Sequence, residues 1–295
     1  MKSIQEQLQN LPQAPGIYLM KDQHQAILYV GKAKNLKQRV RSYFQKSANH
    51  AQKIRRLIRN VATIETIVVD TELDALLLEC EFIQRYHPLY NRQLTQHPNY
   101  LYVGLDDLTL TLSPRAQPNF WGPFKQYKQL PEILTCLTET LELPNLAPIT
   151  QLKLRQQLTT PTLTNAEKKA AITNFFTGQP SRLFDQLSSR ITYCSEHLDF
   201  EQAQRLTTEY NRAQRLHQMI ASLNQFQARA HCQLALPINE QLTKHYLICY
   251  GQIKATQISA AQHIDFPALT ATPIEITKAS LDPLILLMNY YNNFT

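Results

Sequence analysis

The stretch that decides the fold is GIYLMKDQHQAILYVGKAKNLKQRVRSYF, residues 16–44 of a 295-residue chain. Two short apolar runs, 17–20 and 26–30, flank a polar connection, which is the pattern of an antiparallel β-hairpin. Gly31 then breaks the second strand, and the residues after it place apolar side chains at helical spacing on one face. This stretch is therefore expected to form a β-hairpin that leads into a helix, and a short helix within residues 1–15 is expected before it.

Three further elements are predicted after this hairpin and its helix: a helix at 50–60, a strand at 63–69 and a helix at 73–86. Ser47 or Asn49 is a candidate cap for the first of these helices. Thr71, with Asp74 three residues later, is a candidate cap for the second. The first 91 residues thus follow the order β-β-α-α-β-α. This order predicts an α+β fold with a small three-stranded antiparallel sheet and helices packed on it.

The charge of the chain is concentrated near its beginning. The formal net charge is +7, and residues 1–100 hold 14 Lys and Arg against 8 Asp and Glu. Ten of these cations and no acid lie between Lys32 and Arg59. Such a concentration is typical of a protein that binds a polyanion, although a solvated helix face would give the same composition. We expect no membrane span, because no apolar run approaches the roughly 18 residues that a span needs. We expect no membrane binding either, because the basic helix carries no Trp on its apolar side and no lipidation signal.

The cysteines and the N-terminus indicate a cytoplasmic protein. The five cysteines are scattered, with no CxxC pair and no zinc-ligand spacing, and they are expected to be free thiols in a reducing compartment. Residues 1–12 lack the apolar core of a secretory signal.

The rest of the chain is predicted to form further segments. Strands at 100–105 and 108–112 and a helix at 130–141 are expected first, and a proline-marked linker then runs to about residue 165. Amphipathic helices at 183–194 and 198–216 would form a hairpin. A β-hairpin around Gly251 and a helix at 282–291 complete a last, small α+β segment with no evident chemistry. The predicted domains are 1–94, 95–165, 166–225 and 235–295.

Glu79 is the residue whose sequence context most clearly indicates a functional role. Its neighbours on the predicted helix are Ala75, Leu76, Phe82 and Ile83, so its carboxylate is ringed by apolar side chains. A carboxylate in such a place is costly to bury without a partner, and a divalent cation is a suitable one. The alternative is a glutamate that reaches past these residues to solvent or to an arginine.

Arginine and tyrosine side chains near the glycine turn suit phosphate chemistry. Arg39 borders the apolar stripe of the basic helix, and a guanidinium can bind a phosphate and stabilise charge on it. A tyrosine hydroxyl, from Tyr18 or Tyr29, can orient or deprotonate water if its pKa is lowered, and Lys32 is placed to do so. The alternatives are a solvated arginine and ordinary core aromatics.

Several motifs carry a resemblance to a known family. GIY at 16–18 and YVG at 29–31 resemble the signature of the GIY-YIG nuclease superfamily. GKAKNLKQRVRSYF at 31–44, TELDALLLECEFIQRYHPLYN at 71–91 and FWGPF at 120–124 are similar to the N-terminal half of the UvrC-type excinucleases, including the shorter Cho. The resemblance implies a damage- or structure-specific DNA endonuclease of nucleotide excision repair. It also implies one catalytic Mg²⁺ or Mn²⁺ ion.

The resemblance also assigns roles to individual residues. Glu79 would bind the metal, Tyr29 would be the general base, and Arg39 would stabilise the developing charge. The supporting positions would be Tyr18, Lys32, Tyr43 and Asn91. Basic residues would hold the phosphates of double-stranded, damaged or distorted DNA; these are Lys34, Lys37, Arg41, Lys53, Arg55, Arg56 and Arg59.

Two later features bear on partners and cofactors. LDFEQAQRL at 198–206 is similar to the UVR motif, which implies contact with UvrB through the 198–216 hairpin; an ordinary helix pair is the alternative. The cysteine cluster of UvrC-like proteins has no counterpart, since residues 137–193 contain no cysteine, and no iron–sulfur cluster is expected. A second nuclease module is not recognised either, and we expect one incision, 3′ of a lesion. A catalytically idle adaptor, or a nuclease acting on branched or mobile DNA, remains an alternative.

Overall fold

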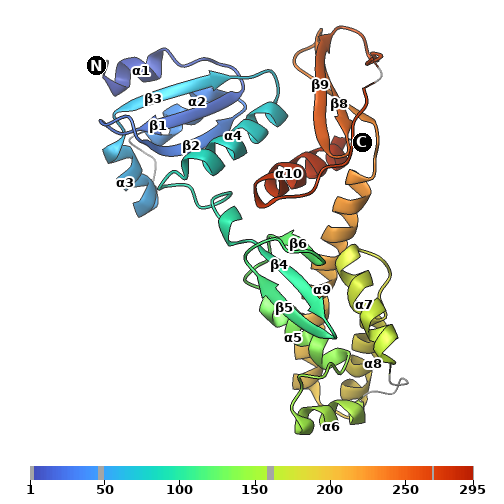
Figure 1. Cartoon of the computed structure of the whole chain (residues 1–295). Coiled ribbons are helices and arrows are strands. Elements are labelled where there is room, and N and C mark those ends of the chain that lie inside the picture. Colours follow the sequence, from blue (N-terminus) through green and yellow to red (C-terminus); the bar gives the residue numbers. More distant parts are fainter. Residues whose placement is uncertain (1–2, 46–49, 158–162, 268, 295) are drawn as a thin grey trace. The chain divides into compact units, whose positions relative to one another are not determined.

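The structure, a computed structural model, describes residues 3–45, 50–157, 163–267 and 269–294. The described residues divide into two compact units (Figure 1). Unit 1 joins residues up to Pro98 with those from Gln227 onward, and unit 2 comprises Asn99–Phe226.

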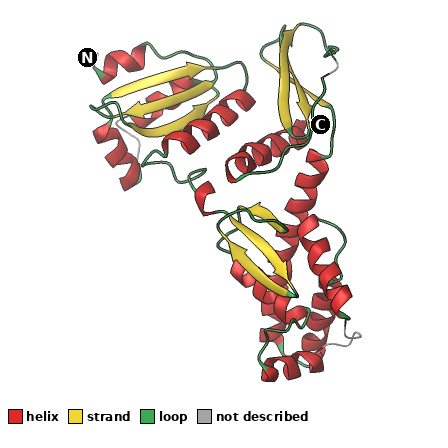
Figure 2. Ribbon diagram, in the orientation of Figure 1, coloured by secondary structure: helices red, strands yellow, loops and turns green. Residues whose placement is uncertain are grey.

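The N-terminal part of unit 1 is built on one antiparallel sheet. Its strands are β1 (Gly16–Lys21), β2 (Ile27–Ala33) and β3 (Thr63–Val68), in the order β2-β1-β3 (Figure 2). The helices around it are α1 (Ile4–Gln9), α2 (Leu36–Tyr43), α3 (Gln52–Asn60) and α4 (Glu72–Tyr86). The predicted α+β class and three-stranded antiparallel sheet are confirmed.

The central strand β1 is buried on both faces, and this separates the helices into two layers. Tyr18 and Met20 pack with α2 and α3 on one face. Ile17 and Leu19 pack on the other face with Ala75 and Ile83 of α4. Successive side chains of a strand point to opposite faces, so the run GIYLM supplies both cores at once.

Local side-chain caps fix where the helices begin. The Thr71 hydroxyl accepts a hydrogen bond from the Asp74 N–H, and the Asp74 carboxylate accepts one from the Thr71 backbone N–H, so the predicted cap of α4 is confirmed. Helix α3 begins at Gln52 rather than His50, and the residue before it, Ala51, provides no side-chain cap. The candidate caps Ser47 and Asn49 lie outside the described residues.

The C-terminal segment folds in the same unit as the β2-β1-β3 sheet. Strands β7 (Cys232–Pro237), β8 (Thr243–Cys249) and β9 (Gln252–Ser259) form an antiparallel sheet in this order, and α10 (Lys278–Phe294) follows. Helix α10 packs against α4. Tyr246 of β8 lies 2.5 Å from Thr71 through their buried hydroxyl oxygens, and Lys244 donates to Asp70 and Asp74 at 2.7 and 3.0 Å.

The described residues of unit 2 form a second sheet and five helices. Its strands are β4 (Leu101–Asp106), β5 (Thr109–Ser113) and β6 (Phe120–Phe124), in the order β5-β4-β6. A 3₁₀ turn at His97–Asn99 precedes them. The helices are α5 (Leu130–Thr140), α6 (Pro148–Gln157), α7 (Asn165–Thr177), α8 (Leu183–Glu196) and α9 (Phe200–Gln227).

The segment predicted as a linker is in part folded. Helix α6 occupies 148–157, and Leu143 and Leu154 are buried. The predicted linker is therefore wrong over this stretch. FWGPF, for which no element was predicted, is strand β6, and its Trp121 stacks on Phe176 of α7 at 5.1 Å between ring centroids.

Candidate active site

Three tyrosines meet on the face of the β1–β2 hairpin that packs against α2. Tyr18 comes from β1, Tyr29 from β2 and Tyr43 from α2, and the ring centroids lie 6.0–6.3 Å apart. The Tyr18 and Tyr43 hydroxyl oxygens are 2.9 Å apart. Tyr18 is buried, so it forms the floor of the site rather than its opening. Burial is the main cause that raises the pKa of Tyr18, and the neighbouring phenols add to it.

Arg39 is held against this cluster by Tyr43. One of its guanidinium nitrogens, Nη2, donates to the Tyr43 hydroxyl at 3.2 Å, and the guanidinium carbon lies 5.1 Å from the ring centroid. The side chain is otherwise exposed. A guanidinium has five N–H donors, so Arg39 is anchored in place and still has donors for a phosphate.

Glu79 stands on α4 across the cleft from the tyrosines. Its carboxylate Oε1 accepts the Lys32 backbone N–H at 3.0 Å, which orients the side chain. Burial raises the pKa of Glu79, while the Lys32 hydrogen bond and the charges of Lys32 and Arg39 act in the opposite direction. A half-buried carboxylate with a free oxygen suits a divalent cation, because Mg²⁺ commonly takes one or two carboxylates and keeps several waters. The residues present therefore fit such an ion.

Lys32 does not play the part predicted for its amine. Its Nζ donates to Glu72 at 2.8 Å, and Glu72 also pairs with Lys34 at 2.9 Å. Burial raises the pKa of Tyr29, and the Tyr43 phenol and Glu79 raise it further. The expectation that Lys32 lowers the pKa of Tyr29 is therefore wrong for the protein alone. The backbone N–H of Lys32, rather than its amine, contacts the site through Glu79.

Asn91 clamps the chain that follows α4 onto strand β2. Its side-chain carbonyl accepts the Val30 N–H at 3.0 Å, and its amide donates to the Val30 carbonyl at 2.9 Å. The neighbouring Tyr90 N–H donates to Leu28 at 3.0 Å. Asn91 thus uses both ends of its amide to complete the edge of β2 beside Tyr29.

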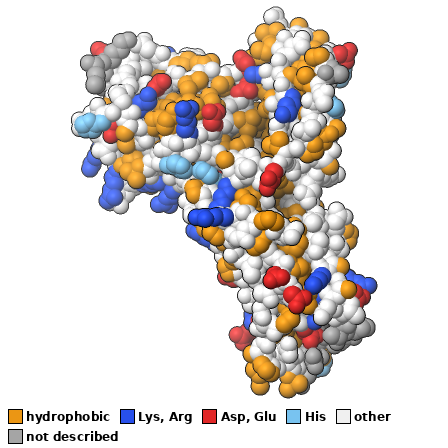
Figure 3. Space-filling view, in the orientation of Figure 1, with side chains coloured by type: hydrophobic (Ala, Val, Ile, Leu, Met, Phe, Trp, Pro, Cys, Tyr) orange, Lys and Arg blue, Asp and Glu red, His pale blue; other side chains and the backbone are white. Residues whose placement is uncertain are grey.

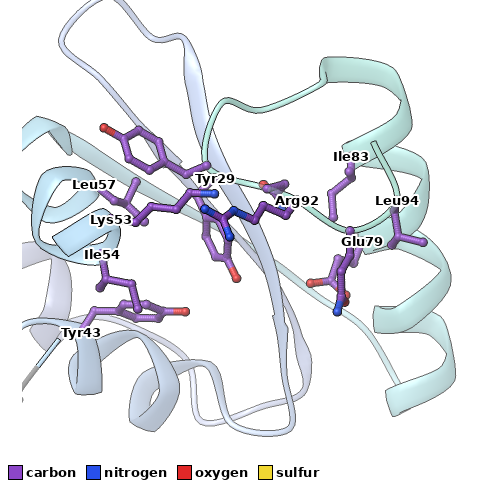
Figure 4. Close-up of a pocket in the computed structure, with 12 residues that line it drawn as sticks. Tyr29, Tyr43, Lys53, Ile54, Leu57, Glu79, Ile83, Arg92 and Leu94 are labelled. Carbon is purple, nitrogen blue, oxygen red and sulfur yellow. The ribbon is translucent and has the colours of Figure 1, made fainter. Parts of the chain in front are cut away.

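These side chains line a cleft of about 340 Å³ (Figure 4). Tyr29, Tyr43, Glu79 and Asn91 border it, so four of the seven predicted site residues lie on its wall. Two cations, Lys53 and Arg92, also reach into it and point toward one another. Burial and the charge of Arg92 lower the pKa of Lys53.

Sequence reasoning did not identify Arg92, or Tyr90 before it, as site residues. The signal that could have found Arg92 is its place directly after the HPLYN segment that carries Asn91.

The predicted DNA-binding cations occupy different settings. Lys34 is committed to Glu72, and Arg41 donates to the Leu8 carbonyl at 3.1 Å. Lys37 is half-buried. The cations of α3 remain exposed or half-buried with no carboxylate within 4.0 Å among the described residues; these are Lys53, Arg55, Arg56 and Arg59. Lys and Arg side chains gather on this part of unit 1 in the space-filling view (Figure 3).

The described residues show no conventional multi-ligand metal site. No group of three or more His, Cys, Asp or Glu side chains converges in the part of the chain that the structure describes. Of the five cysteines, Cys232 is half-buried, and Cys80, Cys136, Cys194 and Cys249 are buried. Among the described helices, none has the length and apolarity that crossing a bilayer would require.

Comparison with known proteins places this site in a family. The UvrC-like GIY-YIG domain matches residues 14–92, which include the sheet, the tyrosines, Glu79 and Asn91. Residues 14–92 are a UvrC-like GIY-YIG domain.

Relatives of known name match about half of the chain. UvrABC system protein C of Clostridioides difficile (strain 630) is 41% identical over 150 residues, which are 48% of this chain and 24% of that protein. The protein of the same name from Clostridium botulinum (strain Hall) is 37% identical over 147 residues, with the same shares. The chain therefore aligns with about a quarter of the length of these relatives.

A solved structure also matches. The GIY-YIG N-terminal endonuclease domain of UvrC from Thermotoga maritima, bound to its catalytic divalent cation, magnesium, is 36% identical. The match covers 31% of this chain and 100% of the chain in that structure, with a TM-score of 0.28.

Proposed function

We propose that this chain is a divalent-metal-dependent DNA endonuclease whose GIY-YIG domain hydrolyses one phosphodiester bond. One observation carries the proposal: the half-buried Glu79 carboxylate faces a cleft shared with Tyr29 and Tyr43, and Arg39 is anchored to Tyr43. The homology of residues 14–92 to the UvrC-like domain supports it. A carboxylate and two phenols around one cleft, with a guanidinium held on one of those phenols, are suited to phosphodiester hydrolysis.

Each residue contributes through its own contacts. Glu79, oriented by the Lys32 N–H, would hold the cation, and Mg²⁺ or Mn²⁺ when bound would stabilise the leaving oxygen. Arg39 would donate to the non-bridging oxygens of the scissile phosphate from its place on Tyr43. Tyr29 would position the attacking water and accept its proton.

The pKa of Tyr29 is raised in the protein alone, so Tyr29 can act as a base only if this pKa is lowered. Burial disfavours its phenolate, so positive charge must arrive with the substrate complex to bring the pKa down. A divalent ion bound by Glu79 would be that added charge, because Lys53 and Arg92 already line the cleft in the protein alone.

The biological role that we propose is the 3′ incision of nucleotide excision repair. The resemblance to the UvrC-type enzymes implies this side of the lesion, and the relatives are named as components of the UvrABC system. Damaged or distorted double-stranded DNA would be the substrate. The surface cations would bind its phosphates without reading sequence, so affinity should fall steeply as salt rises.

UvrB is the proposed protein partner, and the tip of the α8–α9 hairpin supports this. Leu198 and Phe200 are 73% and 64% exposed, and both belong to the UVR-like string LDFEQAQRL. Exposed apolar side chains together at a helix hairpin suit a docking contact. We expect Phe200→Ala to weaken UvrB binding in a pull-down assay, while the matched change at exposed Phe294 leaves it unchanged.

The test is cleavage of an end-labelled duplex containing a lesion or a bubble, with Mg²⁺ or Mn²⁺, with and without UvrB. Wild type, Glu79→Gln and the matched control Glu81→Gln, an exposed glutamate on the same helix, are compared. A single 3′-side nick that Glu79→Gln abolishes and Glu81→Gln retains is the expected result. DNA binding without any metal-dependent cut would instead establish an adaptor.

A further inference from the structure

The active-site cleft continues into two further clefts along α3. The next cleft, of about 400 Å³, shares Lys53, Tyr90 and Arg92 with the first and adds Arg56. A third, of about 390 Å³, shares Leu89 and Tyr90 with the second. Neighbouring clefts share lining residues, so the three clefts lie in a row that starts at Glu79 and passes Tyr90; we call this row of clefts the Tyr90 groove.

The walls of the Tyr90 groove are cationic. Lys53, Arg56 and Arg59 of α3 line it on one side, and Arg92 lines it opposite Lys53. Two carboxylates occur among its lining residues, Glu79 at the active-site end and Asp22 at the far end. Asp22 already accepts the backbone N–H groups of His24 and Ala26 at 2.8 and 2.9 Å. The groove between them presents positive charge to an anionic chain.

The middle of the groove is apolar and aromatic, which phosphate binding alone does not explain. Leu89 is 77% exposed, and Tyr90 lines all three clefts. The Tyr90 ring is fixed in place, because its hydroxyl accepts a hydrogen bond from Asn60 at 3.2 Å and its N–H donates to Leu28. A fixed ring and a leucine beside a row of cations can contact base faces, which a paired duplex keeps stacked inside.

We propose that the Tyr90 groove binds an unpaired DNA strand on one side of the scissile phosphate. The cations hold successive phosphates, and Tyr90 and Leu89 contact the exposed bases. The proposal rests on the proposed function for the position of the scissile phosphate. It adds that the substrate class is DNA with a junction between paired and unpaired strands next to the cut. Such binding is expected to be tolerant of sequence and sensitive to salt.

The experiment measures binding without turnover, by fluorescence anisotropy of the full chain in EDTA. The probes are a fluorescein-labelled duplex, the same duplex with a single-stranded extension, and the same extension made of RNA. Wild type is expected to bind the DNA-extended duplex more tightly than the plain duplex. Leu89→Ser and Tyr90→Leu should reduce this preference, the latter by about tenfold, as loss of a base-stacking ring does.

A matched pair of arginines separates the groove from general charge. Arg56 lines the groove, whereas its exposed neighbour Arg55 lines none of the three clefts. Arg56→Gln should reduce the preference for the extended duplex, and Arg55→Gln should lower affinity for both DNA probes alike. Since Leu89 is exposed, Leu89→Ser tests the groove even if Tyr90→Leu fails to fold.

Three results would overturn the proposal: equal affinity for plain and extended duplex, identical effects of the two arginine changes, or tighter binding of the RNA extension. The preference is read without cleavage. A protein that prefers the extended duplex but never cuts would therefore disprove the nuclease proposal and leave the groove standing. A protein that cuts DNA but binds plain and extended duplex equally would disprove the groove proposal and leave the nuclease proposal standing.

Discussion

Each of the two glycines that frame the signature stands where a side chain would collide. A Cβ on Gly16 would lie 2.1 Å from the Ile67 carbonyl oxygen of β3, which is part of the sheet itself. A Cβ on Gly31 would lie 2.5 Å from the Tyr18 hydroxyl, because Tyr18 pairs directly with Gly31 and its ring crosses this position. Gly16 is therefore needed for the packing of the sheet, and Gly31 is needed for the position of the Tyr18 phenol in the site.

Gly31→Ala is predicted to damage catalysis more than stability. The added methyl must displace the Tyr18 phenol, which then loses its 2.9 Å contact with Tyr43. Displacing site groups by about an ångström can cost on the order of a hundredfold in rate. Single-turnover cleavage measures this loss, and circular dichroism melts measure stability.

The control for this prediction is the Tyr18→Phe background. That variant already lacks the hydroxyl contact, so adding Gly31→Ala should cost less there than in wild type. Equal losses in both backgrounds would show that Gly31 does not act through Tyr18.

At the scale of the element, the sequence predicted what local patterns encode. The capping box of α4, the hairpin and the carboxylate ringed by apolar residues could all be found within a few turns of chain. Helix α6 was missed because Pro148 suggested a break, although proline is well suited to the first position of a helix. Arg92 was missed because pairing of the distant Leu28 and Val30 with its neighbours sets its position.

Helix α7 gives a prediction about pH. Its cap residue Thr164 donates to Glu167 through backbone and hydroxyl, and Arg182 pairs with the same carboxylate, which lowers the pKa of Glu167. A carboxyl with a lowered folded-state pKa stabilises the fold above its unfolded pKa of about 4.3. That contribution is lost as pH falls through the folded-state pKa.

Glu167→Gln should therefore lower the urea midpoint of unit 2 at neutral pH, and the difference from wild type should vanish in acid. Trp121, the single tryptophan, packs on Phe176 of α7 and reports this unfolding by fluorescence. Glu196→Gln, at an exposed glutamate ending α8, is the matched control and should show no such difference. If the urea midpoints of wild type and Glu167→Gln differ by the same amount at neutral and acidic pH, the charge of Glu167 is not the cause of the difference.

At the scale of the whole molecule, the C-terminal strands and α10 belong to the same unit as the β2-β1-β3 sheet. Thr71 and Tyr246, which are 175 residues apart in sequence, share a buried hydroxyl contact. No local pattern could predict such a pairing, so the sequence left residues 235–295 without a role. In the structure, α10 packs against α4, the helix that carries Glu79, and Tyr246 and Lys244 of β8 contact its first turn and cap.

Tyr246→Phe should lower the free energy of unfolding by about 1 kcal/mol, the usual net value of a hydrogen bond, because the Thr71 hydroxyl keeps its bond to Asp74. Chemical denaturation measures this difference. Tyr86→Phe, at an exposed tyrosine of the same unit, should leave stability unchanged. An equal effect of both changes would argue against a stabilising role for the Thr71–Tyr246 contact.

The central claim is that Glu79 holds a catalytic divalent cation, and a Mg²⁺ titration of the cleavage rate tests it most directly. Wild type should cleave with a saturable dependence on Mg²⁺, and Glu81→Gln should follow the same curve. Glu79→Gln keeps the size of the side chain but removes its charge, and it should bind DNA yet show no cleavage at any Mg²⁺ concentration. A Glu79→Gln protein that cleaves at the wild-type rate with the same Mg²⁺ dependence would contradict the account.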